Sequence, residues 1–489
     1  MVIVAGAVLA VVSSIIGFFR PFTMTGPAMP AMNGNTLQGM PLTDMPEMFL
    51  AGAGLLVTLV GAVVLGNRAR PGRGRAVPAT GQRGRWLIAA VATAALTIDI
   101  SKTSTLGFVI PGVRAEYGIT ASTASFLAVA GLSGTATGAL VFTRMADHLG
   151  RRASYLIATL GFTVTSMCGT MPGFGGNVTM CFLMGIAVGG LAPLLITILA
   201  DLFPGKARGP MVTGLSVVAT AIGYLIASGS ALWLEPAFGW RVLWLIGAPT
   251  GLVLAAATFL IPERASFAEA APEPADDAAA DRRRWESRTT FTAGLQRVYA
   301  VAVGLLTFGL TTWVPTLSRA GGLSLTTANT LLTSVAVAMV PCAVLMMLLY
   351  RRIGPVRLAV RLAVCTAALL LALAASGLAG SQVWLTAAAL TATLFAVNTM
   401  AAIFLPIAAD LAETRKRGRA TGTVSFFNRV GGLTGPLLIS LIVSSVTDVL
   451  VAVAVLALIC GTIAWYTGRR HHRVTTAPAP GERMPERSG

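Results

Sequence analysis

Long apolar stretches alternate with short polar breaks along almost the whole chain. A helix needs about 20 predominantly apolar residues to cross the hydrocarbon core of a bilayer, and fourteen stretches come close to that length. They cover residues 2–19, 47–66, 86–112, 121–143, 153–171, 177–201, 211–233, 242–261, 290–316, 326–350, 358–379, 383–408, 420–443 and 449–467. The pattern predicts an all-α polytopic membrane protein with fourteen transmembrane helices.

The composition agrees with this pattern, because 55% of the 489 residues are hydrophobic and only 11% are charged. That balance excludes an ordinary water-soluble enzyme. The five cysteines follow no zinc or iron–sulfur spacing, and the sequence has no phosphate-binding loop. We therefore expect neither a cofactor nor an ATP-driven pump.

The formal charge of +17 indicates membrane topology. If the first residue is cytoplasmic, 29 of the 36 basic residues fall in loops on that side, in clusters of two to six. The basic residues on the opposite side are Arg20, Arg114, Arg241 and Arg319. The positive-inside rule predicts a multi-pass protein of the inner (plasma) membrane with both termini in the cytoplasm. Separate clusters form no continuous basic face for a phosphate backbone, so no nucleic-acid partner is expected.

The chain repeats itself at an offset of 209 residues. The matched positions are Ala200-Asp201-Leu202 with Ala409-Asp410-Leu411, Arg208-Gly209 with Arg417-Gly418, and Gly223 with Gly432. Such a repeat is typical of transporters built from two related bundles around a site near the membrane midplane. The predicted parts are an N-terminal transmembrane hairpin with a Met-rich outside loop (1–70), a basic linker (71–85), a six-helix bundle (86–262), a cytoplasmic loop (263–289), a second six-helix bundle (290–468) and a cytoplasmic tail (469–489).

Two motifs make residues 84–468 resemble the major facilitator superfamily. The first is an acidic residue followed by a Gly-Arg-Arg turn, here Asp147, Gly150, Arg151 and Arg152. The second is a fourth-helix pattern that comprises Gly185, Gly189, Gly190, Pro193, Asp201, Pro204, Arg208 and Gly209, and its counterpart in the second half comprises Glu413, Thr414, Arg417, Gly422, Arg429, Gly431, Gly432 and Pro436. The resemblance is nearest to the branches for metabolites, aromatic acids and organic ions. It implies a 12-helix fold of two six-helix bundles, plus two extra N-terminal helices.

The loop from Asp147 to Arg152 has a physical reason for its composition. Gly150 permits a tight turn, and the two arginines can reach carboxylates or the carboxyl end of a helix. Such pairs would hold the cytoplasmic face shut and break when the bundles rock. The alternative is that the charges set only the topology. The predicted cytoplasmic gate comprises Asp147, Gly150, Arg151, Arg152, Asp201, Arg208, Glu413 and Arg417.

Four charged residues lie inside predicted helices, where an ionisable group is a functional-site hypothesis. Asp99 and Lys102 are three apart on one helix face, while Arg297 and Arg429 lie in the first and fifth helices of the second bundle. A cavity built from all four would favour an anion, with the three cations as clamps and Asp99 exchanging a proton. The alternative is that Asp99 and Lys102 neutralise each other and that the arginines pack or gate. Further polar candidates are Asn398, Gln296, Tyr224 and Tyr299.

Methionine indicates an alternative cargo, because thioethers bind Cu(I) and six methionines lie between residues 24 and 48. Methionine is also a common gap-filler in apolar helices. The candidate copper ligands are Met24, Met29, Met32, Met45, Met48, Met167, Cys168, Met180 and Cys181. A drug or metabolite exporter is a further alternative, although residues 214–229 lack the Gly-Pro-rich motif that the resemblance implies for drug exporters.

These observations together predict a secondary active transporter and not an enzyme. We expect proton-coupled symport of a small organic anion or metabolite by alternating access. The expected partners are the small-molecule substrate, protons and the lipid bilayer, and we expect a monomer.

Overall fold

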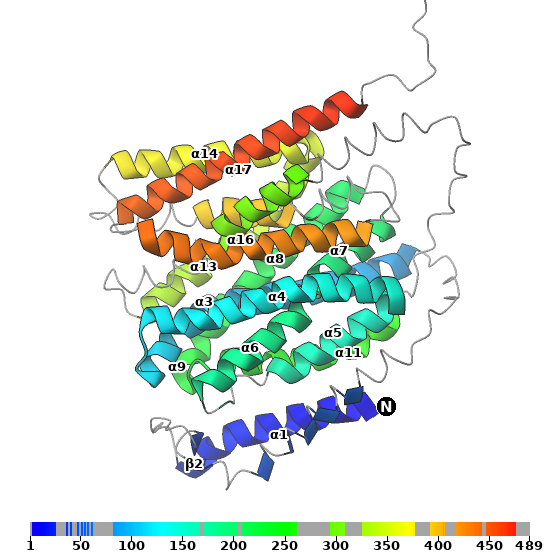
Figure 1. Ribbon diagram of the computed structural model, residues 1–489, viewed down its shortest axis with the longest axis vertical. Coiled ribbons are helices and arrows are strands. Elements are labelled where there is room, and N and C mark those ends of the chain that lie inside the picture. The colour runs from blue at the N-terminus through cyan, green and yellow to red at the C-terminus, as the bar shows by residue number, and fades with distance from the viewer. Residues whose placement is uncertain are drawn as a thin grey trace, which may run out of the picture.

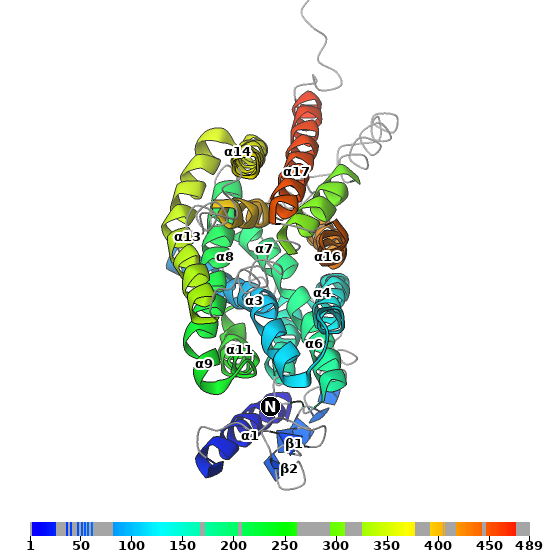
Figure 2. The same cartoon turned by 90° about the vertical axis from the view of Figure 1, so that its left-hand side faces the viewer.

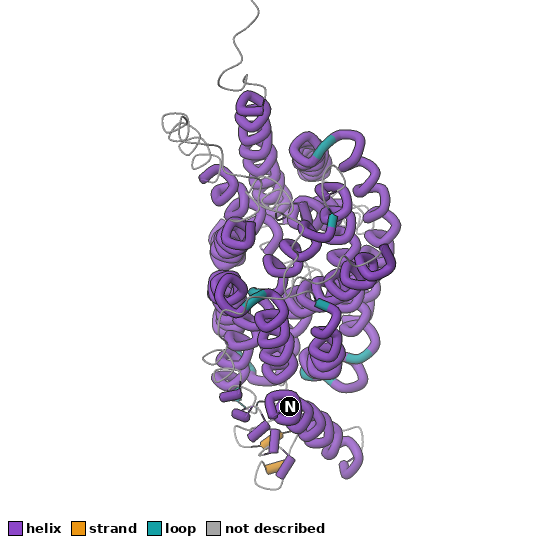
Figure 3. The backbone as a smooth tube through the Cα atoms, turned by 90° about the vertical axis from the view of Figure 1, so that its right-hand side faces the viewer, coloured by secondary structure: helices purple, strands orange, loops and turns teal. Residues whose placement is uncertain are grey.

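The computed structural model describes residues 2–25, single positions and short pieces between 36 and 61, and residues 82–166, 171, 173–203, 208–261, 294–308, 325–376, 392–403, 405, 417–442 and 446–475. Within these residues the chain is almost entirely helical (Figures 1 and 3). The described strands are two residues each, β1 (Thr36–Leu37) and β2 (Met40–Pro41), and they pair antiparallel in the predicted Met-rich loop.

The helices follow the predicted order closely. The first half contains α3 (Gln82–Tyr117), α4 (Ala121–Leu149), α5 (Arg151–Thr165), α6 (Phe174–Gly189), α7 (Leu191–Leu202), α8 (Arg208–Trp233), α9 (Glu235–Phe238), α10 (Val242–Leu245), α11 (Gly247–Ala256) and the 3₁₀ helix η4 (Ala257–Leu260). The second half contains a helix over Gly294–Phe308, then α13 (Leu325–Ile353), α14 (Pro355–Ala375), a helix over Ala392–Ile403, α16 (Arg417–Ile442) and α17 (Val446–Thr475).

Eight helices of the described residues are long and apolar enough to cross a membrane. The helical, multi-pass class is therefore confirmed, while the total of fourteen helices stays a prediction. In Figure 1 the two halves lie on opposite sides of the molecule, with α14 and α17 at one edge and α1 (Val2–Thr25) at the other. Figure 2 shows the same separation from the side.

Close helix contacts at glycine hold the first half together. The backbones of α4 and α6 approach each other so closely that a Cβ on Gly138 would collide with the carbonyl oxygen of Ile186. A Cβ on Gly189 would likewise collide with the backbone of Thr135. Small residues at membrane-helix interfaces permit such approaches, which replace the hydrophobic driving force that lipid cannot supply.

The predicted repeat is visible in the backbone. Gly150 ends α4 with φ 91°, and Gly354 ends α13 with φ 85°, so both tight turns use the region that favours glycine. Gly223 of α8 lies against α3 at Ile100, and its repeat partner Gly432 of α16 lies against Phe308 at the end of the helix over 294–308. The two halves therefore pack their first and fifth helices at matching glycines.

The helix α1 lies against the first half. Its small residues Ala7 and Ala10 are buried with Leu160 and Val164 of α5 and Ala255 of α11. The contacts of α1 with the first half are therefore made through α5 and α11.

Among the described residues, three helix pairs join the halves: α8 with α13, α4 with α16 and α7 with α16. Gly422 of α16 fits against Thr143 of α4 so tightly that a Cβ there would collide with the threonine side chain. The hydroxyl oxygens of Thr197 in α7 and Thr421 in α16 are 3.2 Å apart. The Gly422–Thr143 and Thr197–Thr421 contacts lie near the helix ends that the charge distribution predicts to be cytoplasmic.

Candidate functional site

A cavity lies between the two halves, with about 800 Å³ of space including its open side. From the first half it is lined by Leu96, Asp99, Ile100, Thr103 and Ser104 of α3, Ala192 and Ile196 of α7, and Ser216 and Thr220 of α8. From the second half it is lined by Thr307, Phe308, Asn398, Ala401, Ala402, Leu405, Ser425, Asn428 and Arg429. The lining positions on α3 recur at helical spacing, so one face of that helix forms the wall.

Asp99 and Arg429 are the charged residues among those that line the cavity. They are 1% and 8% exposed, and their charges interact electrostatically. Oδ1 of Asp99 and Nε of Arg429 are buried without a hydrogen-bond partner among the described residues. Buried polar atoms normally have partners, so these two atoms are suited to bind a ligand or a proton.

The aromatic ring of Phe308 lies beside the cationic group. The Arg429 guanidinium carbon is 5.0 Å from the ring centroid, which is within the range of a cation–π contact. The contact fixes the orientation of the guanidinium and adds a flat apolar surface to the cavity wall.

Several other polar side chains of the cavity donate hydrogen bonds to helix backbones. Thr103 Oγ1 donates to the Asp99 carbonyl at 3.0 Å, and Thr220 Oγ1 donates to the Ser216 carbonyl at 2.8 Å. Asn428 Nδ2 donates to the Ala300 carbonyl at 3.1 Å. These donors are therefore already engaged. Asn398 differs from them, because its buried Nδ2 has no hydrogen-bond partner within the described chain.

Lys102, one of the three expected clamps, does not line this cavity. Its Nζ donates to the carbonyl oxygen of Leu243 at 2.7 Å and lies 3.4 Å from that of Trp244. Those carbonyls belong to the short helix α10, which ends at Leu245, just before α11 begins at Gly247. Lys102 lies about 60° around α3 from Asp99, and its long side chain reaches these carbonyls and ties α3 to α10.

Arg297 also lies outside the cavity, because it is eleven residues before Phe308 on the same helix, or about 16 Å along the axis. It is exposed, with its guanidinium carbon 5.8 Å from the ring centroid of Phe427. Without the charges of Lys102 and Arg297, the expected +2 becomes one carboxylate and one guanidinium. Of the further polar candidates, Asn398 lines the cavity and Gln296, Tyr224 and Tyr299 do not.

The expected gate residues fall into separate contacts at the ends of α4, α5, α7 and α16. Arg151 pairs with Asp201, and Arg208 Nε donates to the Ala200 carbonyl at 3.0 Å, all within the first half. Arg152 lies over the ring of Phe259 at 5.2 Å. Gly150 forms the turn between α4 and α5.

One gate contact joins the two halves and uses a residue that the sequence did not single out. Arg419 Nε donates to Asp147 Oδ2 at 3.0 Å, with the two side chains 73% and 37% exposed. The run of basic residues from Arg415 to Arg419 gave no reason to choose Arg419. Glu413 and the side chain of Arg417 lie outside the described residues.

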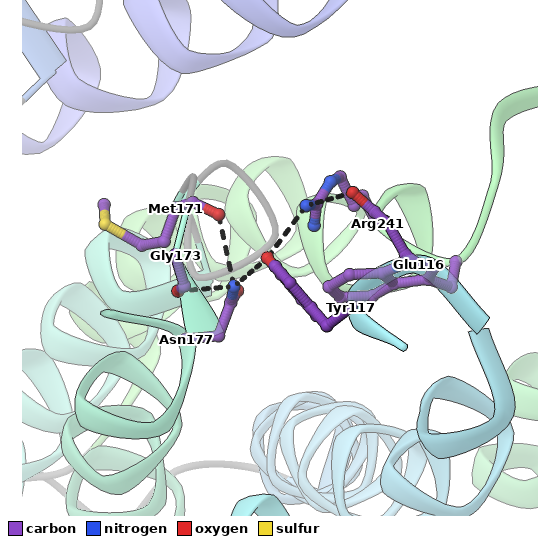
Figure 4. A network of polar contacts seen from close by, with 7 residues as sticks. Glu116, Tyr117, Met171, Gly173, Asn177 and Arg241 are labelled. Carbon is purple, nitrogen blue, oxygen red and sulfur yellow. Dashed lines mark hydrogen bonds and ion pairs between the residues drawn. The ribbon is translucent and has the colours of Figure 1, made fainter. Parts of the chain in front are cut away.

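A second polar network lies at the opposite end of α3 (Figure 4). Arg241 donates to Glu116 at 2.8 Å and to the Tyr117 hydroxyl at 3.0 Å. Glu116 also accepts from Trp240 Nε1 at 2.7 Å, and Asn177 donates to the Tyr117 hydroxyl at 2.9 Å. The network joins the ends of α3, α6 and α10 within the first half, so it fixes that half as a unit.

Most of the candidate copper ligands fall on side chains outside the described residues, namely Met24, Met29, Met32, Met45, Met48, Met167 and Cys168. Cys181 is a buried cysteine whose Sγ contacts the Leu127 carbonyl at 3.5 Å, and Met180 is partly buried. Nothing in these contacts supports the copper alternative.

Comparison with known sequences identifies related transporters. The chain is 30% identical to a gallate transporter of Pseudomonas putida over 50% of this chain and 61% of that protein. It is 32% identical to a 4-hydroxybenzoate transporter of Acinetobacter baylyi over 38% and 41%, and 27% identical to a gentisate transporter of Corynebacterium glutamicum over 69% and 77%. The chain thus spans about half the length of the first two relatives. These relatives are transporters, which confirms that the chain is not an enzyme.

The fold and the family agree with these matches. The crystal structure of a D-xylose–proton symporter superposes with a TM-score of 0.59 at 17% identity, covering 78% of this chain and 97% of the symporter. The sequence profile of the Major Facilitator Superfamily matches residues 86–397 and 298–488. Because these matches cover more than half of the chain, the protein belongs to the Major Facilitator Superfamily.

Proposed function

We propose that the protein is a secondary active transporter that carries a small aromatic carboxylate together with a proton. The single observation that carries this proposal is that Asp99 and Arg429 line one cavity between the halves, each with a buried atom that has no hydrogen-bond partner among the described residues. An anion site and a proton site that share a cavity are what such a symporter requires.

The cavity wall supports an aromatic anion over a sugar. Leu96, Ile100, Ile196, Phe308 and Leu405 give it broad apolar surfaces. A sugar would need many hydrogen-bonding partners, whereas several hydroxyl groups here are engaged with their own helices. A flat apolar ring with one carboxylate fits a mostly apolar pocket with a few polar groups.

The charges of the cavity suggest how proton and anion are coupled. With Asp99 ionised, its charge compensates that of Arg429, and an incoming carboxylate would compete with Asp99. Protonation of Asp99 removes this competition and leaves the guanidinium to form charge-assisted hydrogen bonds with the substrate. One proton then enters with one monocarboxylate, so the transport cycle moves no net charge.

Alternating access would use the contacts between the halves. In the orientation given by the positive-inside rule, the Asp147–Arg419 pair and the Thr197–Thr421 contact lie on the cytoplasmic side. Both contacts must break for the cavity to open toward the cytoplasm. In this proposal the protein resides in the plasma membrane with both termini in the cytoplasm. Contacts of α4 and α7 with α16 close the cytoplasmic side of the cavity.

The names of the relatives support the same class of substrate. Gallate, 4-hydroxybenzoate, benzoate and gentisate are each a benzene ring with a carboxylate, and niacin is a pyridine ring with a carboxylate. For this chain the aromatic carboxylate is a proposal because the first two relatives are matched over 61% and 41% of their length.

Uptake into proteoliposomes tests the proposal. Labelled aromatic acids should accumulate when an inward proton gradient is imposed, and a potassium diffusion potential of either sign should leave the initial rate unchanged. Uptake that needs no proton gradient would contradict the coupling. Proton-driven uptake of Cu(I) with no uptake of any aromatic acid would contradict the anion cargo, and proton-driven export of apolar cations would favour a drug exporter.

A further inference from the structure

We infer that Asn398 recognises a hydroxyl group on the ring of the substrate and so determines which aromatic acids are carried. This inference rests on the proposed function and deepens it. It assigns a specificity-determining role to an uncharged side chain opposite the proton site.

The position of Asn398 supports direct contact with a ligand. Its residue is 7% exposed, it lines the cavity, and its Nδ2 atom has no hydrogen-bond partner among the described residues. Ala401, Ala402 and Leu405 follow at helical spacing and line the same cavity. The amide is therefore the polar member of an otherwise apolar stripe, with small side chains beside it that leave room for a ring.

The chemistry of the amide selects a hydroxyl group. One end of the asparagine amide donates and the other accepts, whereas a hydroxyl group both donates and accepts. A ring hydroxyl can therefore satisfy the amide whichever of its ends faces the cavity. A ring hydrogen or methyl group cannot, and it would leave the buried amide unpaired, which weakens binding of the unsubstituted acid.

The carboxylate has a stronger partner elsewhere in the cavity. Arg429 carries the positive charge and a buried Nε without a partner within the described chain. A carboxylate gains more from a cation than from a neutral amide. With the carboxylate at Arg429, the ring lies along the apolar wall and presents its substituents to the other polar groups, among them Asn398, whose buried donor has no partner among the described residues.

The test compares ring substituents at one site. Binding of benzoate, 3-hydroxybenzoate and 4-hydroxybenzoate to the purified protein is measured by competition with a labelled acid. The wild type should bind at least one hydroxybenzoate about tenfold more tightly than benzoate, which is the range expected for one hydrogen bond to a buried group. In Asn398→Leu this ratio should fall to about one, mainly through loss of affinity for the hydroxybenzoate.

A neighbouring residue provides the control. Thr399 is also buried, but its hydroxyl donates to the Phe395 carbonyl at 2.8 Å and it does not line the cavity. Thr399→Val should keep the wild-type ratio. Should Asn398→Leu fail to insert, Asn398→Ala replaces it, and Asn398→Ser, which keeps a hydroxyl group, should retain part of the preference.

Each outcome separates the inference from the proposed function. Equal weakening of all three acids in the Asn398 variants would make Asn398 a carboxylate ligand and overturn the inference. An unchanged ratio in those variants would also overturn it, while the aromatic-acid proposal would stand. If the wild type binds none of the acids, the proposed function fails and the inference fails with it.

Discussion

The two halves of the molecule share a scaffold but contribute different chemistry to the cavity. At the repeat offset of 209, Ser216 of α8 corresponds to Ser425 of α16, and both line the cavity. At the same offset Thr220 corresponds to Arg429, and Asp99 corresponds to Phe308. The first half thus supplies the carboxylate, and the second half supplies the guanidinium and the aromatic ring.

This difference places the two charges on opposite sides of the interface between the halves. If both charges lay in one half, rocking would leave their separation unchanged. Because Asp99 and Arg429 belong to different halves, any relative movement of the halves changes the interaction between the two charges. That change alters the affinity of Asp99 for a proton and the affinity of Arg429 for the anion. The asymmetry between equivalent positions is therefore what can couple transport to protons.

Replacing the cation should have the largest effect on transport. Arg429→Met removes the cation that is proposed to bind the substrate carboxylate. It should lower uptake and exchange at least about 100-fold, because the buried ion pair between guanidinium and carboxylate can no longer form. The matched change at the repeat position, Thr220→Val, removes a hydroxyl that donates to its own helix and should cost far less. Initial uptake rates at equal amounts of inserted protein measure both. A similar loss in both variants would mean that the halves are equivalent in binding.

The polar network of the first half should affect stability more than binding. Arg241→Met leaves Glu116 without its ion-pair partner and should destabilise the protein by about 3 kcal/mol, since one member of a largely buried pair is removed. The melting temperature in detergent should fall while the affinity for the substrate stays near that of the wild type. A large change in affinity at normal stability would instead place Arg241 in the substrate path.

Lys102 provides a sharper comparison because it lies on the same helix as Asp99. Lys102→Met leaves the carbonyls of Leu243 and Trp244 without this donor and should lower stability by about 1–3 kcal/mol. The proton dependence of uptake should be retained. Loss of proton-driven uptake at normal stability would return Lys102 to the coupling site.

The exposed contact between the halves should have the smallest effect. Asp147 and Arg419 are both accessible to solvent, and such pairs contribute about 0.2–1 kcal/mol. Arg419→Ala should therefore change the transport rate by less than about fivefold, and added salt should reduce the difference. A complete loss of transport would show that this pair controls access by more than its charge.

The sequence predicted the fold better than the geometry of the site. Apolar length and the repeat locate most helices, and depth in the membrane selects Asp99 and Arg429. Depth does not give the direction of a side chain. Lys102 therefore lies on a helix that lines the cavity, but its side chain contacts the backbone of α10. Depth in the membrane also predicts too many charges in the cavity, because Arg297 lies about three helical turns from it. Asn398 had no sequence signal that separated it from other polar residues, since its distinguishing feature is a buried amide nitrogen without a hydrogen-bond partner among the described residues.

The central claim is that Asp99 exchanges the proton while Arg429 holds the anion. Asp99→Asn keeps the size and polarity of the side chain but cannot ionise. In proteoliposomes this variant should fail to accumulate the aromatic acid under an inward proton gradient, yet should still exchange labelled for unlabelled acid across the membrane. Proton-driven accumulation at the wild-type level would contradict the account. Loss of both accumulation and exchange in a correctly inserted protein would also contradict it, because Asp99 would then be needed to bind the substrate.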